Sequence, residues 1–264
     1  MPMIDRKVII YPSAEVLQEA LAARFLLKIS DRLAKHQRVD VALTGGTDGI
    51  ALLRAVGVSP LASAVDWSRV HLWWGDERFV PEDDPDRNAL QAREAWFGKL
   101  VENGEMPESH IHEMPADTRD DKARMTATED ENYDAVTQAA KAYEKEIVKA
   151  LGKKQAFDIA LFGVGPDGHF ASLFPNHPVL RSKDKKTRVV GITDSPKLPP
   201  MRISLTVPFI RSCRRVWVFA SSPRKAEAVG NALAGTNNPQ VPSSFAGGAK
   251  ETLWLLDKDS AANL

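Results

Sequence analysis

Short apolar runs that each end in a polar turn recur along the chain. They occupy residues 39–43, 69–74, 157–162 and 215–220. Each run ends in a turn that contains glycine, aspartate, serine or arginine, and helical patterns lie between the runs. Apolar runs of this length that alternate with helices are typical of buried strands in a parallel sheet. We therefore predict an α/β fold, with a mostly parallel, doubly wound (Rossmann-like) sheet and helices on both faces, in a single domain over residues 1–264.

Three segments have the apolar spacing of long helices. The first covers residues 13–36, where Ser13 is a favourable N-cap. The second is expected from Tyr133 onward, and the third from the end of the turn at 221–225 to Leu233. These helices would connect the parallel strands.

Charge and composition exclude several classes of protein. Lys and Arg number 35, as do Asp and Glu, so the net charge is zero and there is no basic field for nucleic acid or anionic membranes. No segment reaches the ~18 consecutive apolar residues of a membrane helix. The single cysteine, Cys213, cannot form an internal disulfide. We expect a cytoplasmic protein, a monomer or weak homodimer, that binds neither nucleic acid nor membrane.

The turn at residues 44–49, TGGTDG, joins a predicted strand to a helix that runs through Val56 and that we expect Gly57 to end. Glycines at such a turn leave backbone N–H groups free at the positive end of the helix dipole, and threonine hydroxyls add donors. An anion is therefore expected to bind to four of its residues, Thr44, Gly45, Gly46 and Thr47.

Two other interpretations of this turn stay open. It can be a plain strand-to-helix turn. It also mimics a nucleophile elbow, although Thr47 stands where that motif has serine. Asp48 does not suit an anion site, and we expect its side chain to cap the helix instead.

The turn at residues 163–169, GVGPDGH, combines a histidine with a carboxylate two residues away. His169 is predicted to be a general base, with Asp167 orienting it and Gly168 contacting the substrate. The glycines also fit the dinucleotide fingerprint, but Pro175 limits the helix that follows to about two turns, which is too short for a nicotinamide site.

Cations and a further carboxylate stand near other strand ends. Arg78 and Asp76 belong to the GDER turn, Arg202 opens RISLT, and Lys225 begins a helix. Because ligands of parallel sheets bind at the carboxyl ends of the strands, these four residues are candidates for substrate binding. The cations suit a phosphate. The His-x-His pair at 110–112 has no partner at metal-ligand spacing, which favours a surface loop.

Four segments resemble the 6-phosphogluconolactonase family, which belongs with the glucosamine-6-phosphate isomerase/deaminase group. They are WWGDERFVP (73–81), IHEMP (111–115), FGVGPDGHFASLFP (162–175) and RISLT (202–206). The resemblance covers most of the chain. It implies hydrolysis of 6-phospho-D-glucono-1,5-lactone to 6-phospho-D-gluconate in the oxidative pentose phosphate pathway, with a small phosphorylated sugar lactone as the partner and no metal or organic cofactor.

The residues distinguish two branches of that group. Deaminases have a motif similar to DGHIAFNEP, whose glutamate is catalytic, where this chain has SLFP at 172–175 with no acid. They also have an M-D-E-Y-type turn where this chain has GDER at 75–78. Both differences favour the lactonase. Relatives often have SGGSTP where this chain has TGGTDG, and Ser-Asn where Arg87-Asn88 stands. Deamination of glucosamine 6-phosphate and phosphosugar binding without catalysis remain the alternatives.

The resemblance and the residues together suggest a mechanism. His169 would deprotonate the water that attacks C1 and return the proton to the ring oxygen, with Asp167 holding the imidazole or a sugar hydroxyl. The phosphate would be gripped by the glycine-rich turn and by three cations, Arg78, Arg202 and Lys225.

Overall fold

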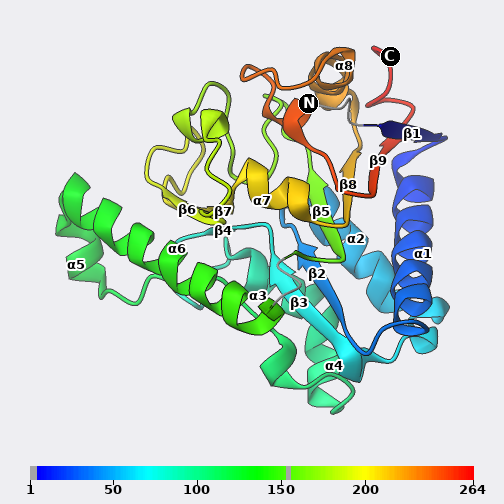
Figure 1. Ribbon diagram of the computed structural model, residues 1–264, viewed down its shortest axis with the longest axis horizontal. Helices are drawn as coiled ribbons and strands as arrows, with labels where there is room; N and C mark the ends of the chain where they lie inside the picture. Colours follow the sequence, from blue (N-terminus) through cyan, green and yellow to red (C-terminus); the bar gives the residue numbers. More distant parts are fainter. Residues whose placement is uncertain (1–4, 153–155) are drawn as a thin grey trace.

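A six-stranded parallel sheet forms the centre of the molecule in the computed structural model, which describes residues 5–152 and 156–264 (Figure 1). Every neighbouring pair of strands is parallel, which confirms the predicted sheet. The strand order is β1 (Arg6–Tyr11), β9 (Glu251–Asp257), β8 (Arg215–Ala220), β5 (Ile159–Gly163), β2 (Val39–Leu43) and β3 (Val70–Trp74).

Alternate side chains of one strand show that both faces of this sheet are covered. Trp74 of β3 packs edge-on against Phe97, which belongs to a layer with α1 (Ala14–Leu33) and α2 (Gly46–Val58). Trp73, its neighbour, faces Tyr143 of α6 (Glu129–Leu151) instead. Successive side chains of a strand point to opposite faces, so these contacts define two helical layers.

Local signals explain where the long helices begin. Ser13 caps α1 by accepting a hydrogen bond from the Val16 amide, as its sequence predicts. A capping box between Thr128 and Glu131 starts α6, which therefore begins four residues before the expected Tyr133. The remaining α-helices of the described residues are α3 (Asn88–Ala92), α4 (Gly98–Glu102), α5 (Asp121–Thr126), α7 (Val207–Ser212) and α8 (Ala226–Ala234).

A second, three-stranded antiparallel sheet, which the sequence analysis does not predict, lies beside the first. Its order is β4 (Asp76–Arg78), β7 (Arg202–Leu205) and β6 (Val189–Ile192). The GDER segment, expected to be only a turn, supplies β4, which begins two residues after the end of β3. A strand of three residues, two of them carboxylates, lacks the apolar pattern that identifies strands in a sequence.

Two further expectations about helices are wrong. Gly57 lies inside α2, which continues to Val58. The end is set by Pro60, since the residue before a proline is biased to extended backbone, and Ser59 has φ −73° and ψ 130°. Residues 164–177 contain no helix, although a short one is expected there. A positive φ is incompatible with a regular right-handed helix, and three residues of this segment have one: Gly168, Ala171 and Asn176.

The order of the strands places a ligand site at one end of the sheet. The chain passes from β2 outward to β3, and later returns to the other side of β2 as β5. The loops that leave β2 and β5 therefore diverge, and such switch points hold the ligands of open α/β sheets. Within the described residues, no helix has the length and apolar character that crossing a membrane requires.

Candidate functional site

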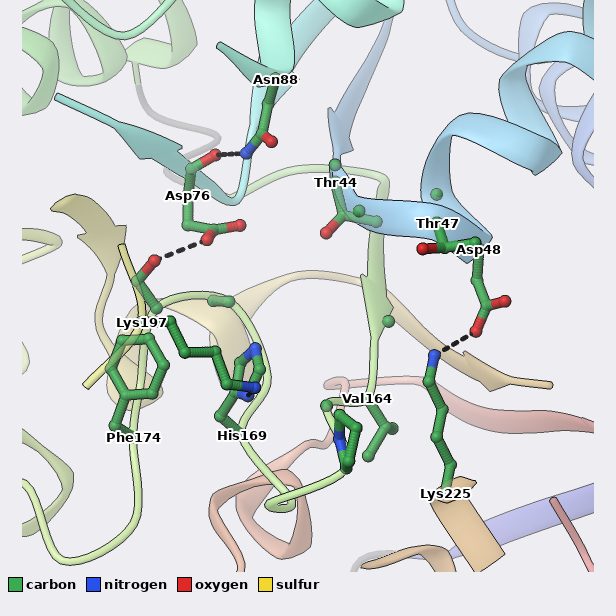
Figure 2. Close-up of a pocket in the computed structure, with 18 of the residues that line it drawn as sticks. Thr44, Thr47, Asp48, Asp76, Asn88, Val164, His169, Phe174, Lys197 and Lys225 are labelled. Carbon is green, nitrogen blue, oxygen red and sulfur yellow. Dashed lines mark hydrogen bonds and ion pairs between the residues drawn. The ribbon is translucent and has the colours of Figure 1, made fainter. Parts of the chain in front are cut away.

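A cavity of about 360 Å³ lies at this switch point, at the carboxyl ends of the central strands (Figure 2). The loops after β2, β5 and β8 line it, together with β4 and β7 of the second sheet. Of the residues predicted for the site, all but Asp167 and Gly168 contribute to the lining: Thr44, Gly45, Gly46, Thr47, Asp76, Arg78, His169, Arg202 and Lys225. The structure therefore brings together residues from separate parts of the chain.

The predicted histidine and carboxylate are in direct contact. Nδ1 of His169 lies 2.5 Å from Oδ1 of Asp167. A carboxylate accepts hydrogen bonds, so Nδ1 carries the proton in the neutral ring, and Nε2 is left with a free lone pair. No hydrogen bond to Nε2 is found among the residues that the structure describes. This arrangement suits a general base that takes a proton from a water in the cavity.

Lys197 is a third member of this cluster and is not anticipated from the sequence. Its Nζ lies 3.0 Å from Oδ1 of Asp167 and 3.1 Å from Nδ1 of His169. Partial burial of Asp167 opposes its ionisation, but hydrogen bonds and charge attraction from His169 and Lys197 outweigh it and hold the pKa of the carboxyl well below its usual range. Asp167 is therefore a carboxylate at neutral pH, as an orienting group requires.

Close packing fixes the imidazole from two further directions. The ring of Phe174 lies 4.9 Å from that of His169, centroid to centroid. On Gly165, a Cβ atom would lie 2.1 Å from Nδ1 of His169 and 2.6 Å from Oδ1 of Asp167. A side chain at this position would displace the histidine and the carboxylate together. Gly168, with φ +81°, shapes the turn instead, and its carbonyl accepts a hydrogen bond from the amide of Ser243.

The glycine-rich turn opens the N-terminus of α2 to the cavity. Gly45 is the N-cap and has no side chain to occupy the first amides of the helix. A Cβ atom on Gly45 would lie 1.8 Å from Oδ1 of Asn88, and Gly46 has φ +76°. A side chain would therefore clash at the first position and strain the backbone at the second. The free amides and the helix dipole are favourable for an anion, and anion binding at this turn stays a prediction.

Asp48 does not cap this helix, contrary to the expectation. Its carboxylate is buried and turns toward the loop after β8, where it accepts hydrogen bonds from the amide and the hydroxyl of Ser221. Nζ of Lys225 lies 2.5 Å from the same carboxylate (Figure 2). These donors outcompete the helix amides because one of them is charged.

Two arginines face each other at the side of the cavity formed by the second sheet. Arg78 of β4 pairs in register with Arg202 of β7, and like charges placed opposite each other destabilise a sheet. Burial and the nearby Arg78 lower the pKa of Arg202 to about 10, so Arg202 remains a cation at neutral pH. Backbone carbonyls alone accept their hydrogen bonds among the described residues. An anion bound between them would remove the repulsion.

The two carboxylates of β4, Asp76 and Glu77, have different surroundings. Asp76 accepts a 2.7 Å hydrogen bond from the hydroxyl of Ser172, and its backbone carbonyl accepts one from the side chain of Asn88. Glu77 points the other way and is fully buried. It accepts hydrogen bonds from the amides of Asn88 and Ala89 at the start of α3. Burial raises the pKa of Glu77 to about 7, against the opposing effects of Arg87 and these amides.

Two other motifs, the His-x-His pair at 110–112 and the GVGPDG segment at 163–168, lie in structural contexts that the sequence did not reveal. His112 does not lie in an exposed loop: its ring stacks 3.8 Å from Trp73, and its nitrogens contact His71 and Glu146. The surface-loop interpretation is therefore wrong, because a tryptophan of the edge strand β3 covers the imidazole. The GVGPDG segment is followed by no helix, so it lacks the helix N-terminus that binds a dinucleotide pyrophosphate.

Comparison with known proteins supports one family. The model of the family described as glucosamine-6-phosphate isomerases/6-phosphogluconolactonase matches residues 12–254. The chain is similar to a 6-phosphogluconolactonase of Streptomyces coelicolor, with 42% identity over 98% of this chain and 94% of that protein. A 6-phosphogluconolactonase of Mycobacterium tuberculosis is 40% identical over 97% of each chain. A solved 6-phosphogluconolactonase from Trypanosoma cruzi has the same fold, with a TM-score of 0.80 and 24% identity over 99% of this chain and 97% of that one.

Proposed function

The chain belongs to the glucosamine-6-phosphate isomerase/6-phosphogluconolactonase family, and we propose that it hydrolyses 6-phospho-D-glucono-1,5-lactone to 6-phospho-D-gluconate. One observation carries this assignment. A histidine paired with a carboxylate shares a single cavity with two arginines that face each other and an open helix N-terminus. The cavity thus offers a base at one side and anion-binding groups at the other.

The chemistry of a lactone suits this set of residues. A δ-lactone is an activated ester, so a positioned water and one base are sufficient, without a covalent nucleophile or a metal. His169 takes a proton from the water through Nε2 as its oxygen bonds to C1. The tetrahedral intermediate then expels the ring oxygen, which receives the proton from His169. Asp167 stabilises the imidazolium that exists between these two steps.

The phosphate of the substrate acts as a handle for the reacting carbonyl. Amides of Gly46 and Thr47 and the guanidinium groups of Arg78 and Arg202 are the proposed contacts. Binding energy from this remote group positions C1 beside His169. Asp76 has a carboxylate in the cavity lining and is the proposed acceptor for a sugar hydroxyl.

The residues after the histidine favour the lactonase over the deaminase. Phe174 of the SLFP segment stands at the position where the deaminase motif has its glutamate. The segment contains no acid, and a phenylalanine cannot transfer a proton as that glutamate would. The monomeric or weakly dimeric state and the cytoplasmic location stay predictions.

A coupled assay tests the proposed reaction. Fresh 6-phosphogluconolactone is generated from glucose 6-phosphate, and 6-phosphogluconate is followed with phosphogluconate dehydrogenase, with spontaneous hydrolysis subtracted. We expect the protein to accelerate the reaction well above the blank. Ammonia release from glucosamine 6-phosphate without lactone hydrolysis would instead establish the deaminase. Stabilisation by 6-phosphogluconate with neither reaction would identify a binding protein.

A further inference from the structure

Asp48 is a negative charge placed inside an anion-binding site. It belongs to the first turn of α2, whose amides face the cavity, and its side chain is only 5% exposed. Oδ2 lies 2.5 Å from Nζ of Lys225, and Oδ1 lies 2.6 Å from the hydroxyl of Ser221. Figure 2 shows the carboxylate and the ammonium meeting at the edge of the cavity below Thr47. A site built only to attract phosphate has no use for this carboxylate.

The contacts of Asp48 distinguish Lys225 from two other cations that line the cavity, Arg78 and Arg202. Lys225 is neutralised by its partner, and at 16% side-chain exposure it has little water to screen the pair. Arg78 and Arg202 form no ion pair with a carboxylate among the described residues, and both line the cavity. Asp48 therefore offsets one of the positive charges that line the cavity.

In the proposed reaction, the charge of the cavity affects the binding of the product more than that of the substrate. The substrate lactone carries charge only on its phosphate, because the ester is neutral. Hydrolysis adds water across the C1–O bond and yields a carboxylic acid that ionises, so the product carries one more negative charge. A more positive cavity would strengthen the binding of product more than that of substrate.

We propose that Asp48 is a specificity-determining residue that weakens the binding of phosphorylated anions and so favours release of the product. It acts by its own charge and by holding Lys225 away from the phosphate. This role rests on the proposed function, because it assigns a task to a residue of the same cavity. It requires no movement of the backbone.

The variant Asp48→Asn tests this role by removing the charge while keeping the shape of the side chain. Titration calorimetry with 6-phosphogluconate measures binding without turnover, and gluconate serves as the ligand that lacks phosphate. We expect the Kd of 6-phosphogluconate to fall by about 3- to 10-fold in the variant, and by less for gluconate. The difference should shrink as the salt concentration rises, since salt screens the charges.

A second pair of proteins guards against poor folding of the single variant, which leaves Lys225 without its partner. Lys225→Gln and the double variant Asp48→Asn/Lys225→Gln differ only in the charge of Asp48. The double variant should bind 6-phosphogluconate more tightly than Lys225→Gln by a similar factor. Asp134→Asn, an exposed change of equal charge on α6, is the control and should leave the Kd unchanged.

Unchanged or weaker binding in both Asp48→Asn proteins would overturn the proposal, and so would a failure of the wild type to bind 6-phosphogluconate. Equal tightening by Asp134→Asn would overturn it too, because net charge alone would then explain the effect. The lactonase assay on the wild type is separate. A protein that binds as expected but does not hydrolyse the lactone would refute the proposed function and leave the charge effect of Asp48 in place.

Discussion

The imidazole of His169 is held so closely that a single methyl group can displace it. Gly165→Ala would place a Cβ atom 2.1 Å from Nδ1 of this ring. We expect kcat for lactone hydrolysis to fall by roughly 10- to 1,000-fold, because a misplaced general base loses much of its effect. Gly235→Ala, where a Cβ atom meets nothing within 4 Å, is the matched control. Equal activity of the two variants would contradict the packing role of Gly165.

Lys197 shares Oδ1 of Asp167 with the histidine, and its removal should disturb catalysis rather than binding. For Lys197→Met we expect kcat to fall by about 3- to 30-fold with little change in KM, since Asp167 loses a charged donor that helps to orient it. Lys197→Arg keeps the charge and should retain most of the activity. Steady-state kinetics decides, and a rise in KM at constant kcat would show that Lys197 contacts the substrate.

Sequence patterns identify partners in this site only where the interacting residues are close together in the sequence. His169 and Asp167 stand two residues apart in a glycine-rich turn, and the structure shows their contact. Lys197 is contributed by a loop 28 residues beyond His169, with no local pattern to indicate it. The partner of Asp48 is 177 residues away, so the function of that carboxylate could not be read from its own turn.

At the scale of elements, Glu77 joins β4 to the start of α3 and should make the stability of the protein depend on pH. Its folded pKa of about 7 lies above the ordinary value of 4.5, so the folded state binds the proton more tightly. Stability from this group is complete below the lower pKa and is lost as the pH rises through the folded pKa. Because of this group, the free energy of unfolding of the wild type should fall by about 1–3 kcal/mol between pH 5 and pH 8.

Urea unfolding at these two pH values measures the effect. Glu77→Gln does not titrate, so its stability relative to the wild type should improve on going from pH 5 to pH 8. The comparison is made as a difference, because Gln also loses hydrogen bonds at the start of α3 at both values. A difference that does not change with pH would show that Glu77 ionises normally.

The elements that sequence reasoning locates are those whose residues are buried on both faces. The strands β2, β3, β5 and β8 stand out as continuous apolar runs. The edge strand β1 is mostly exposed and lacks such a run, whereas β9 is as apolar as the central strands and the same criterion would have identified it. Two strands of the second sheet, β4 and β7, carry polar residues toward the cavity, which hides them in the sequence, and β6 is only four residues long.

At the scale of the whole molecule, the cavity is assembled from segments that lie far apart in the sequence. Its residues range from Thr44 to Lys225, and they come from the loops after β2, β5 and β8 and from β4 and β7 of the second sheet (Figure 1). A ligand that bridges these segments binds only the folded chain and not the unfolded one. We retain a single domain over residues 1–264 as a proposal, since both sheets contribute to this one cavity.

Ligand binding should therefore raise the stability of the entire fold. A hundredfold excess of 6-phosphogluconate over its Kd stabilises a folded protein by about 2.7 kcal/mol. We expect a clear rise in Tm for the wild type and for His169→Ala, and a much smaller rise for Arg78→Ala, because the phosphate handle is lost. Thermal unfolding followed by circular dichroism measures it. Equal shifts in all three proteins would contradict the place assigned to the phosphate.

The central claim is that His169 activates the water that opens the lactone. The most direct test is the hydrolysis of fresh 6-phosphogluconolactone by His169→Ala beside the wild type, with the spontaneous rate subtracted. We predict that kcat falls by roughly 10²- to 10⁴-fold while KM changes little, since the groups that hold the phosphate remain. Hydrolysis by the variant at the wild-type rate would contradict the mechanism and require a different base.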